Sequence, residues 1–258
     1  MLFINTRPDD RALVLTQALE AAGYQVEALP LLELVAMPFS ESLQQLYTEL
    51  RQVQAVVVVS PTAVDVGMRY LQQAGVQLDQ LKSIQWIAVG QTTAQALAKF
   101  QIESHVPEVE TSEGMLQLPI LKQQKKLTKI AFWRGLGGRQ FMMQQLQQQG
   151  VEILNFVLYH RQCPEQSLIA FPEIVKKISF NQPVAVLMSS EASWNYWQQL
   201  SNQYPCSAQW VYLVLGSRLA QLLHSTQSQA VKGFNIIQLE NLSASEIIQR
   251  MSDWQGHV

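Results

Sequence analysis

The sequence is poor in charged residues and in cysteine. Charged residues make up 15% of the 258 positions and the formal net charge is −2, so bulk electrostatics predict no nucleic-acid partner and no membrane partner. An anionic ligand would therefore need local hydrogen-bond donors. The two cysteines, Cys163 and Cys206, form no CxxC pair and no disulfide framework. This cysteine usage favours a reducing cytoplasm.

Long apolar runs and metal-ligand spacings are also missing. No window approaches the roughly 18 apolar residues of a membrane span, and the apolar start at residues 1–8 lacks the basic region of a signal peptide. Neither a GxSxG motif nor a nucleophilic-cysteine signature occurs. The histidines are scattered without metal-ligand spacing, so no metal site is expected. They are His105, His160, His224 and His257.

Apolar residues are plentiful, at 48% of the chain, which is enough for true hydrophobic cores and excludes a disordered chain. Short apolar runs alternate with amphipathic stretches of about 10–15 residues, a rhythm typical of βα units and parallel sheets. The predicted strands are 2–6, 25–29, 55–60, 86–89, 129–133, 152–156, 184–189, 210–215 and 234–239.

The chain contains an internal repeat. Residues 2–7 match 129–134, so that Arg7 falls on Arg134, and the same shift of 127 positions carries 19–26 onto 146–153. Two further matches keep a similar shift, 56–60 with 185–189 and 87–90 with 213–216. A shift that stays nearly constant over the whole length indicates that the two halves are duplicates.

Two copies of an α/β unit present two sets of strand carboxyl ends, and ligands in such sheets bind outside those ends. A cleft between two domains is therefore the expected site. The segments 30–37 and 157–164 hold equivalent places in the repeat and are apolar and extended in character. They are candidates for the two places where the chain crosses between the domains.

Helix starts follow several predicted strands. Ser60 with Pro61 suits an N-cap and first helical position, and 90–94 and 112–114 suit two further starts. The free backbone N–H groups of such a start can face an anion. A Ser-Pro pair is in most proteins only a cap, and one such contact contributes about 0.3–1 kcal/mol, so several must converge to hold a polyanion.

The loop 134–139 carries three glycines between Arg134 and Arg139. It lacks the GxGxxG order of a dinucleotide site and has Arg139 where the third glycine is needed, which makes nucleotide binding the weaker interpretation. Tyr159 lies on a predicted crossover. Taken alone, it is more often a packing residue than an acid.

Together these features resemble the uroporphyrinogen-III synthase family, whose members close the tetrapyrrole ring of haem, sirohaem and cobalamin. No single motif is specific, but the order and spacing of the motifs cover nearly the whole chain. The matching segments are 6–8, 23–31, 60–64, 88–94, 134–139 and 158–159.

The resemblance implies a fold of two flavodoxin-like α/β domains, each a parallel sheet with helices on both faces, joined by a two-stranded β-ladder. Residues 1–33 and 165–258 would form one discontinuous domain, and 38–158 the other. Residues 34–37 and 159–164 would be the crossover strands.

The resemblance also implies a reaction that needs no cofactor. The substrate would be hydroxymethylbilane, a linear tetrapyrrole with eight carboxylates, which loses its terminal hydroxyl to give an azafulvene. Spontaneous closure gives the type I isomer. In the enzyme, the substituted carbon of ring D attacks, and a spiro intermediate fragments and recloses with ring D inverted. The protein's main task would be orientation.

Residue roles follow from the same resemblance. Tyr159 is the candidate for assisting loss of the hydroxyl, because its phenol is neutral at pH 7 and can donate a hydrogen bond. Hydroxyls, backbone amides and guanidinium groups at strand ends would bind the acetate and propionate groups. The expected binding residues are Arg7, Ser60, Pro61, Thr62, Gly90, Gln91, Thr92, Thr93, Arg134, Gly135, Ser189, Ser190, Gly216, Ser217 and Arg218.

The second half departs from the family in two places. Ser189-Ser190-Glu191 stands where Ser-Pro-x is usual, and Glu191 would repel carboxylates if it faced the cleft. Leu219 replaces a threonine of the family. Arg218 beside it would compensate by offering a bidentate donor to a carboxylate.

Two other functions remain open on the sequence. A non-catalytic cytosolic protein with two α/β domains closing on a small ligand would bind without turnover. A nucleotide-dependent transferase would use the loop 134–139 and show phosphate-dependent protection. On the synthase interpretation we expect a cytoplasmic monomer that receives its substrate by transient hand-over from hydroxymethylbilane synthase.

Overall fold

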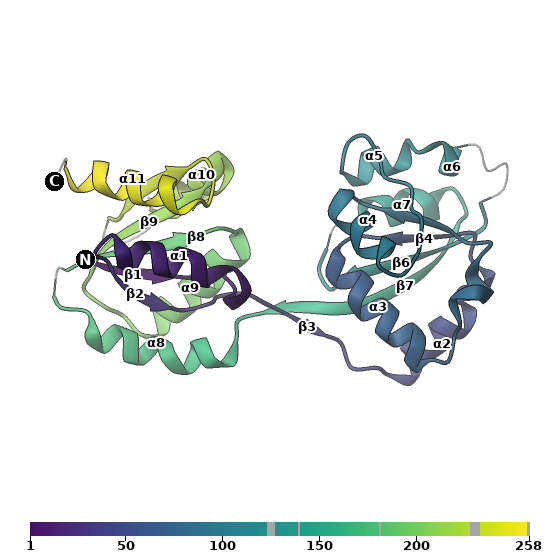
Figure 1. The fold of residues 1–258 in the computed structure, drawn as a ribbon, viewed down its shortest axis with the longest axis horizontal. Coiled ribbons are helices and arrows are strands. Elements are labelled where there is room, and N and C mark those ends of the chain that lie inside the picture. The colour runs from purple at the N-terminus through teal and green to yellow at the C-terminus, as the bar shows by residue number, and fades with distance from the viewer. Residues whose placement is uncertain (123–126, 139, 181, 228–232, 257–258) are drawn as a thin grey trace. The chain divides into compact units, whose positions relative to one another are not determined.

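The computed structural model describes residues 1–122, 127–138, 140–180, 182–227 and 233–256. Contacts divide the chain into two units (Figure 1). Unit 1 consists of residues 1–33 and 162–258, and unit 2 is the continuous segment 34–161. The chain therefore passes from one unit to the other twice.

Unit 1 is built on a five-stranded sheet in which every neighbouring pair is parallel. Across the sheet the strands are β10, β9, β8, β1 and β2. Counted along the chain within the unit, this is the order 2-1-3-4-5 of flavodoxin-like sheets. The strands are β1 (Leu2–Asn5), β2 (Gln25–Ala28), β8 (Pro183–Met188), β9 (Gln209–Leu215) and β10 (Asn235–Leu239).

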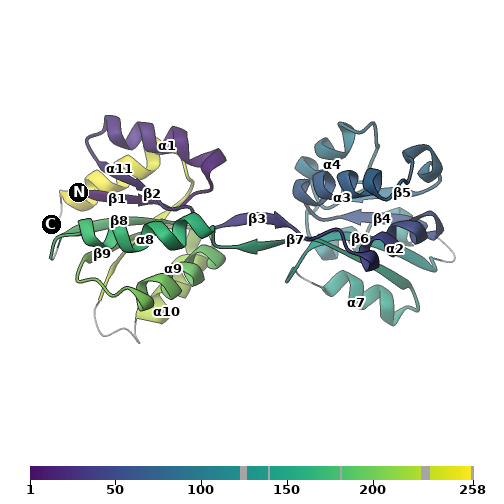
Figure 2. The same ribbon diagram turned by 90° about the horizontal axis from the view of Figure 1, so that it is seen from below.

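Helices cover both faces of this sheet, as Figure 2 shows. Because side chains alternate along a strand, Leu2 and Ile4 enter one core while Phe3 enters the other. The first core includes residues of α8, α9 and α10, and the second residues of α1 and α11. The helices are α1 (Asp9–Ala21), α8 (Glu165–Lys177), α9 (Glu191–Gln203), α10 (Gly216–Gln227) and α11 (Ala244–Gln255).

Unit 2 has a sheet of the order β3-β7-β6-β4-β5. The pairs of β4 with β5 and β6, and of β6 with β7, are parallel. His105 adds a parallel bridge to Ile87 of β5, at the place that β10 takes in unit 1. The strands are β3 (Glu33–Ala36), β4 (Ala55–Val58), β5 (Gln85–Ala88), β6 (Lys129–Gly135) and β7 (Glu152–Gln162).

The core of unit 2 is rich in aromatic side chains around Trp133 of β6. Its ring packs edge-on against Tyr47 and Trp86, and Gly67 must lack a side chain because a Cβ there would lie 2.2 Å from the indole. The helices are α2 (Glu41–Glu49), α3 (Pro61–Gln73), α4 (Gln91–Ala98), α5 (Ser112–Leu116), α6 (Pro119–Lys122) and α7 (Phe141–Gln148), with 3-10 turns η1 (Leu50–Gln52) and η2 (Leu78–Leu81). This packing holds the carboxyl end of β6 in place.

The strand registers reveal the duplication directly. Leu2 pairs with Gln25 as Lys129 pairs with Glu152, both at the shift of 127. One sequence match was wrong by one residue. Phe3 pairs with Ala185, whereas its counterpart Ile130 pairs with Ala55, so Ser60 corresponds to Ser190 and not to Ser189. Both of these serines cap a helix.

The predicted fold class is confirmed: each unit is an α/β sheet with helices, parallel throughout unit 1 and parallel from β7 to β5 in unit 2. All nine predicted strands are present within about two residues at most boundaries, but β7 continues to Gln162, well beyond the predicted end at residue 156. Tyr159 is therefore part of the unit 2 sheet. The extra strand β3 borders β7, and Met37 N donates to Leu158 O at 2.9 Å.

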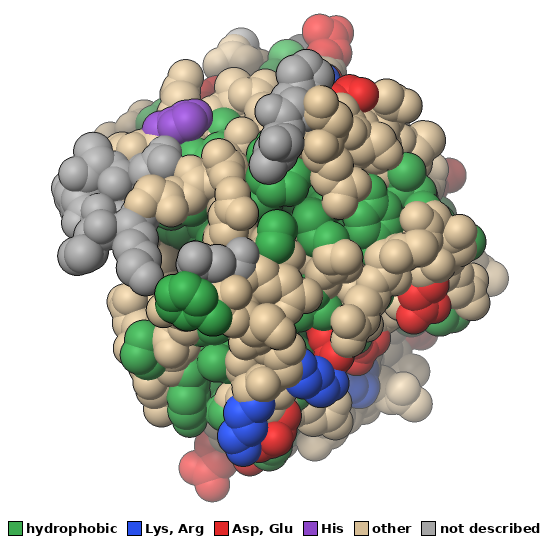
Figure 3. All heavy atoms as spheres, turned by 90° about the vertical axis from the view of Figure 1, so that its left-hand side faces the viewer, with side chains coloured by type: hydrophobic (Ala, Val, Ile, Leu, Met, Phe, Trp, Pro, Cys, Tyr) green, Lys and Arg blue, Asp and Glu red, His purple; other side chains and the backbone are tan. Residues whose placement is uncertain are grey.

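Within the described residues, no helix is long and apolar enough to cross a membrane. The face of unit 1 drawn in Figure 3 carries few charged side chains, and apolar and uncharged polar groups predominate on it.

Candidate functional site

The carboxyl edge of the unit 2 sheet brings Ser60 and Tyr159 together, although they lie 99 residues apart in the chain. Ser60 follows β4 and is the N-cap of α3, where its Oγ accepts a hydrogen bond from Ala63 N at 3.1 Å. The same Oγ lies 2.9 Å from Tyr159 Oη. Tyr159 is only 3% exposed. The parallel strands β4 and β7 lie on either side of β6, so residues toward their carboxyl ends can meet at one edge of the sheet.

Gly135 makes room for the tyrosine ring. The pairing of β6 with β7 slips at this point, since Arg134 faces Val157 and Gly135 faces Tyr159. Such an irregularity re-aims a side chain. A Cβ on Gly135 would lie 2.6 Å from the Tyr159 ring, and Leu136 N donates to Tyr159 O at 2.7 Å. Only glycine fits beside this ring.

Arg134 carries a buried guanidinium next to the tyrosine, and the residue is 4% exposed. It donates to the carbonyl of Gly138 and lies 3.5 Å from the sulfur of Met143. Burial lowers the pKa of Arg134, and the nearby Tyr159 has the opposite effect. In the described part of the chain no carboxylate forms an ion pair with it. A buried cation of this kind is costly unless an anion joins it. Arg139 lies outside the described residues.

The helix start at α4 already holds a carboxylate. Gly90, the N-cap, has no side chain to offer, and Gln91 N donates instead to Glu110 Oε1 at 2.8 Å. A Cβ on Gly90 would lie 2.3 Å from the Glu110 carboxylate. Thr93 is buried and Thr92 is exposed. The predicted anion site at this helix start is thus occupied by an anion from the chain itself.

The carboxyl edge of unit 1 forms a cavity of about 620 Å³. Ser189, Ser190, Glu191 and Arg218 all line it, together with apolar residues of α10 such as Leu219. Glu191 and Arg218 form an ion pair of 3.3 Å with side chains 55% and 92% exposed. An exposed pair of this kind contributes at most about 1 kcal/mol and is easily exchanged.

The remaining predicted residues of unit 1 do not line this cavity. They are Arg7, Gly216 and Ser217. Arg7 is partly buried and reaches the carbonyl of Leu242 at 3.4 Å. Gly216 has a φ of +75°, a left-handed conformation at the start of α10 that favours glycine.

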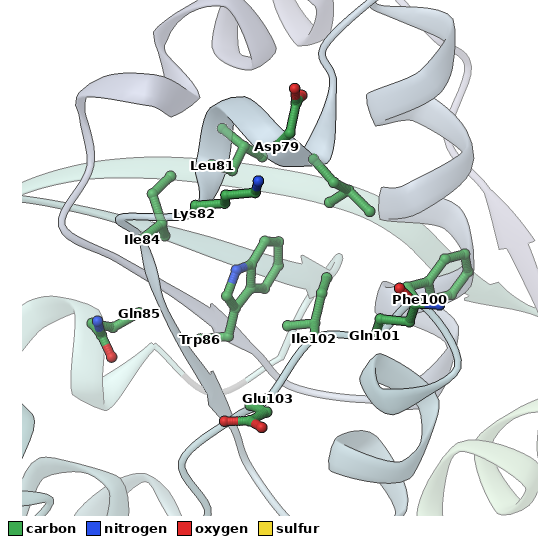
Figure 4. Close-up of a pocket in the computed structure, with 11 residues that line it drawn as sticks. Asp79, Leu81, Lys82, Ile84, Gln85, Trp86, Phe100, Gln101, Ile102 and Glu103 are labelled. Atoms are coloured by element: carbon green, nitrogen blue, oxygen red, sulfur yellow. The ribbon is translucent and has the colours of Figure 1, made fainter.

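A second cavity, of about 480 Å³, lies at the opposite, amino end of β5 (Figure 4). Trp86 and Ile102 line it together with charged side chains such as Asp79 and Lys82. It contains none of the predicted site residues, and the sheet edge there is the one where α/β proteins do not bind ligands.

The described residues include no group of three or more His, Cys, Asp or Glu side chains placed to hold a metal. Cys163 and Cys206 are free thiols, and burial raises the pKa of both.

Sequence reasoning missed three contributors to these sites: Glu110, Gly138 and Met143. Glu110 reaches α4 through an irregular loop, and no local pattern marks it. The contacts of Arg134 with Gly138 and Met143 depend on how the loop folds back. The glycine content of the loop 134–139 was the only sequence feature that pointed to these contacts.

Comparison with known proteins identifies the family. A family model described as uroporphyrinogen-III synthase HemD matches residues 14–231. The chain belongs to the uroporphyrinogen-III synthase family. It is accordingly an enzyme, a cyclising lyase.

Relatives of the family cover almost the whole chain. A uroporphyrinogen-III synthase of Salmonella typhimurium is 28% identical over 239 residues, 90% of this chain and 94% of the relative. Crystal structures share the fold. One from Thermus thermophilus has a TM-score of 0.63 at 16% identity and 99% coverage of both chains. One from Helicobacter pylori has a TM-score of 0.56 at 13% identity, with 98% of both chains covered.

Proposed function

We propose that this chain converts hydroxymethylbilane to uroporphyrinogen III, with loss of water and inversion of ring D through a spiro intermediate. The observation that carries the proposal is the hydroxyl of the buried residue Tyr159 at the carboxyl edge of unit 2, 2.9 Å from Ser60 Oγ and near enough to Arg134 to affect its pKa. An acid, a hydroxyl partner and a cation converge there.

Tyr159 acts on the departing hydroxyl. The pyrrole nitrogen supplies electrons, the C–O bond breaks with its electron pair on oxygen, and the phenol hydrogen joins that oxygen to leave water. The substituted carbon of ring D then attacks the azafulvene carbon, and the spiro intermediate fragments and recloses. The proton lost when the last pyrrole becomes aromatic again restores the phenol. Acid assistance of this kind contributes about 10²–10⁴-fold.

Donors at the strand ends bind the substrate carboxylates. In unit 2 these are Arg134 and the α4 start, where the Glu110 contact supports the proposal because a carboxylate fits the helix end. In unit 1 they are Ser189, Ser190 and Arg218 of the cavity. The further binding residues proposed are Arg7, Pro61, Thr62, Gly90, Gln91, Thr92, Thr93, Gly135, Gly216 and Ser217.

The proposal extends to the setting of the enzyme. We place it in the cytoplasm as a monomer that takes its unstable substrate from hydroxymethylbilane synthase, and its two free thiols suit a reducing compartment. The functional domains are taken as 1–33 with 165–258 and 38–158. Residues 34–37 and 159–164 are the crossover strands.

A coupled assay tests the reaction. Purified protein is mixed with freshly generated hydroxymethylbilane, and the oxidised products are separated by chromatography without added cofactor. Predominance of the type III porphyrin is the expected result. Type I alone, at the rate without enzyme and from folded protein, would exclude the synthase activity.

A further inference from the structure

Ser60 Oγ has two hydrogen-bonding neighbours in the structure, Ala63 N at 3.1 Å and Tyr159 Oη at 2.9 Å. A serine hydroxyl carries one hydrogen and can accept at its lone pairs. The backbone N–H of Ala63 can only donate, so one lone pair of Oγ is committed to the helix cap. The single hydrogen of Ser60 is then available to Tyr159.

We propose that Ser60 is a positioning residue that donates to Tyr159 Oη and leaves the phenol hydrogen free for the departing hydroxyl of the substrate. This inference rests on the proposed function and sharpens the role of Ser60, which we first assigned to carboxylate binding. If Tyr159 donated to Ser60 instead, the phenol hydrogen would not be available to the substrate.

The proposed chain of donors has a consistent direction. Ala63 N–H donates to Ser60 Oγ, Ser60 donates to Tyr159 Oη, and Tyr159 donates to the substrate. Hydrogen bonds in such a series strengthen one another. The series begins at the amino end of α3, a helix of 13 residues whose positive end favours electron density on the oxygens.

Gly135 provides the space in which the Tyr159 ring lies. A Cβ there would meet two ring carbons at 2.6 Å and the hydroxyl oxygen at 3.1 Å. The ring therefore rests against bare backbone while its hydroxyl is held by Ser60. The backbone of Tyr159 is fixed in turn by Leu136 N.

Unit 1 indicates that the fold does not require this contact. Ser190, the counterpart of Ser60, caps α9 by accepting from Ser193 N at 3.1 Å, and its Oγ lies 2.8 Å from Ser193 Oγ. The residue matching Tyr159 at the shift of 127 is Leu32, which has no hydroxyl. The same sheet and the same capped helix form without a serine–tyrosine pair.

The test compares Ser60→Ala with a capping control in the same unit. Ser40 caps α2 by accepting from Leu43 N at 3.2 Å and otherwise contacts Ser42, so Ser40→Ala removes a helix cap but leaves the Ser60–Tyr159 contact in place. Both variants should lower Tm by similar amounts. Only Ser60→Ala should lower the single-turnover rate constant, by about 10-fold, because Ser60 supplies part of the general-acid effect. The steady-state KM should change less than about 3-fold.

Two substitutions separate the hydroxyl from the cap. Ser60→Thr keeps the hydroxyl and should recover most of the activity. Ser60→Gly keeps a good helix start but removes the hydroxyl, so it should match Ser60→Ala even if alanine impairs folding.

A double-mutant cycle decides whether Ser60 acts through Tyr159. In a Tyr159→Phe background, Ser60→Ala should cause no further loss of kcat. Additive losses, or a rise in KM with kcat unchanged, would overturn the proposal and make Ser60 a direct ligand of a substrate carboxylate. If the wild-type protein forms only the type I isomer, the proposed function fails instead.

A spectroscopic readout does not depend on turnover. In protein labelled with ¹³C at tyrosine Cζ, the Tyr159 signal is identified by its loss in Tyr159→Phe. Ser60→Ala should shift that signal, and Ser40→Ala should not. A Tyr159 signal unmoved by Ser60→Ala would contradict the contact itself.

Discussion

The two units share four equivalent strands in the same order, β2-β1-β8-β9 and β7-β6-β4-β5, but differ at their carboxyl edges. In unit 2 the matching positions hold Ser60, Tyr159 and a buried Arg134, whereas in unit 1 they hold Ser190, Leu32 and a partly buried Arg7. The capping serine is common to both because the helix start needs it. The tyrosine occurs in unit 2 alone, so it is the residue that most clearly distinguishes the two edges.

The two carboxyl edges also differ in how far their charged side chains are exposed to water. Arg134 is withdrawn from water, while Glu191 and Arg218 of unit 1 face it. Electrostatic interactions are strong in a dry environment and weak and salt-screened at an exposed one. On the proposed function, unit 2 would supply the chemistry, and unit 1 would bind carboxylates through exposed and easily exchanged charges.

Removing the tyrosine hydroxyl should erase the main difference between the units. Tyr159→Phe is expected to lower single-turnover kcat by about 100-fold, within the range for lost acid assistance, with Tm nearly unchanged. Tyr24→Phe is the matched control, since the Tyr24 hydroxyl contacts only the exposed Gln255 in the described structure. Full activity of Tyr159→Phe would refute the assigned role.

The two equivalent arginines should differ in effect. Arg134→Met is expected to raise KM by about 10-fold or more, because a charged hydrogen bond in a buried place contributes about 1.5–3 kcal/mol. Arg7→Met should change KM less than about 3-fold. Steady-state kinetics of the pair measure the difference, and equal effects would show that burial does not distinguish the two positions.

Glu110 competes with substrate carboxylates at α4 if that helix start binds them. Glu110→Gln keeps an acceptor near Gln91 N but removes the charge, so substrate binding should tighten about 2–5-fold at low salt. The gain should shrink as salt is added. Weaker binding would instead make Glu110 a purely structural cap.

The smallest effect is expected at the exposed pair of unit 1. Glu191→Gln frees Arg218 and removes a charge that repels carboxylates, which should lower KM about 2-fold at low salt and not at high salt. Arg218→Gln should act in the opposite direction. If neither substitution changes KM, this cavity does not take part in substrate binding.

Sequence pattern predicted the strands well because their cores demand continuous apolar runs, such as Ala55–Val58. It also placed the helix starts at Ser60 and Gly90 correctly, since capping is a local effect. The sequence match aligned Ser60 with Ser189 instead of Ser190. The runs before these serines are uniformly apolar, so no residue in them fixes the alignment.

The site contacts were harder to foresee for a physical reason. The meeting of Ser60 with Tyr159 depends on a register slip at Gly135 and on the space left by its missing side chain. The Glu110 contact depends on the path of an irregular loop. Both are set by tertiary packing, which periodicity does not encode.

The discontinuity of unit 1 has a consequence for biosynthesis. Unit 2 is one continuous segment, but Thr6 donates to the carbonyl of Leu187, a residue 181 positions later. At about 5–20 residues per second, β1 waits on the order of 10–40 s on the ribosome for its neighbour β8. Throughout that time β1 and β2 have an unpaired edge. Unit 2 is then the first part of the nascent chain able to fold, and unit 1 is completed only when its two outer segments have both been synthesised.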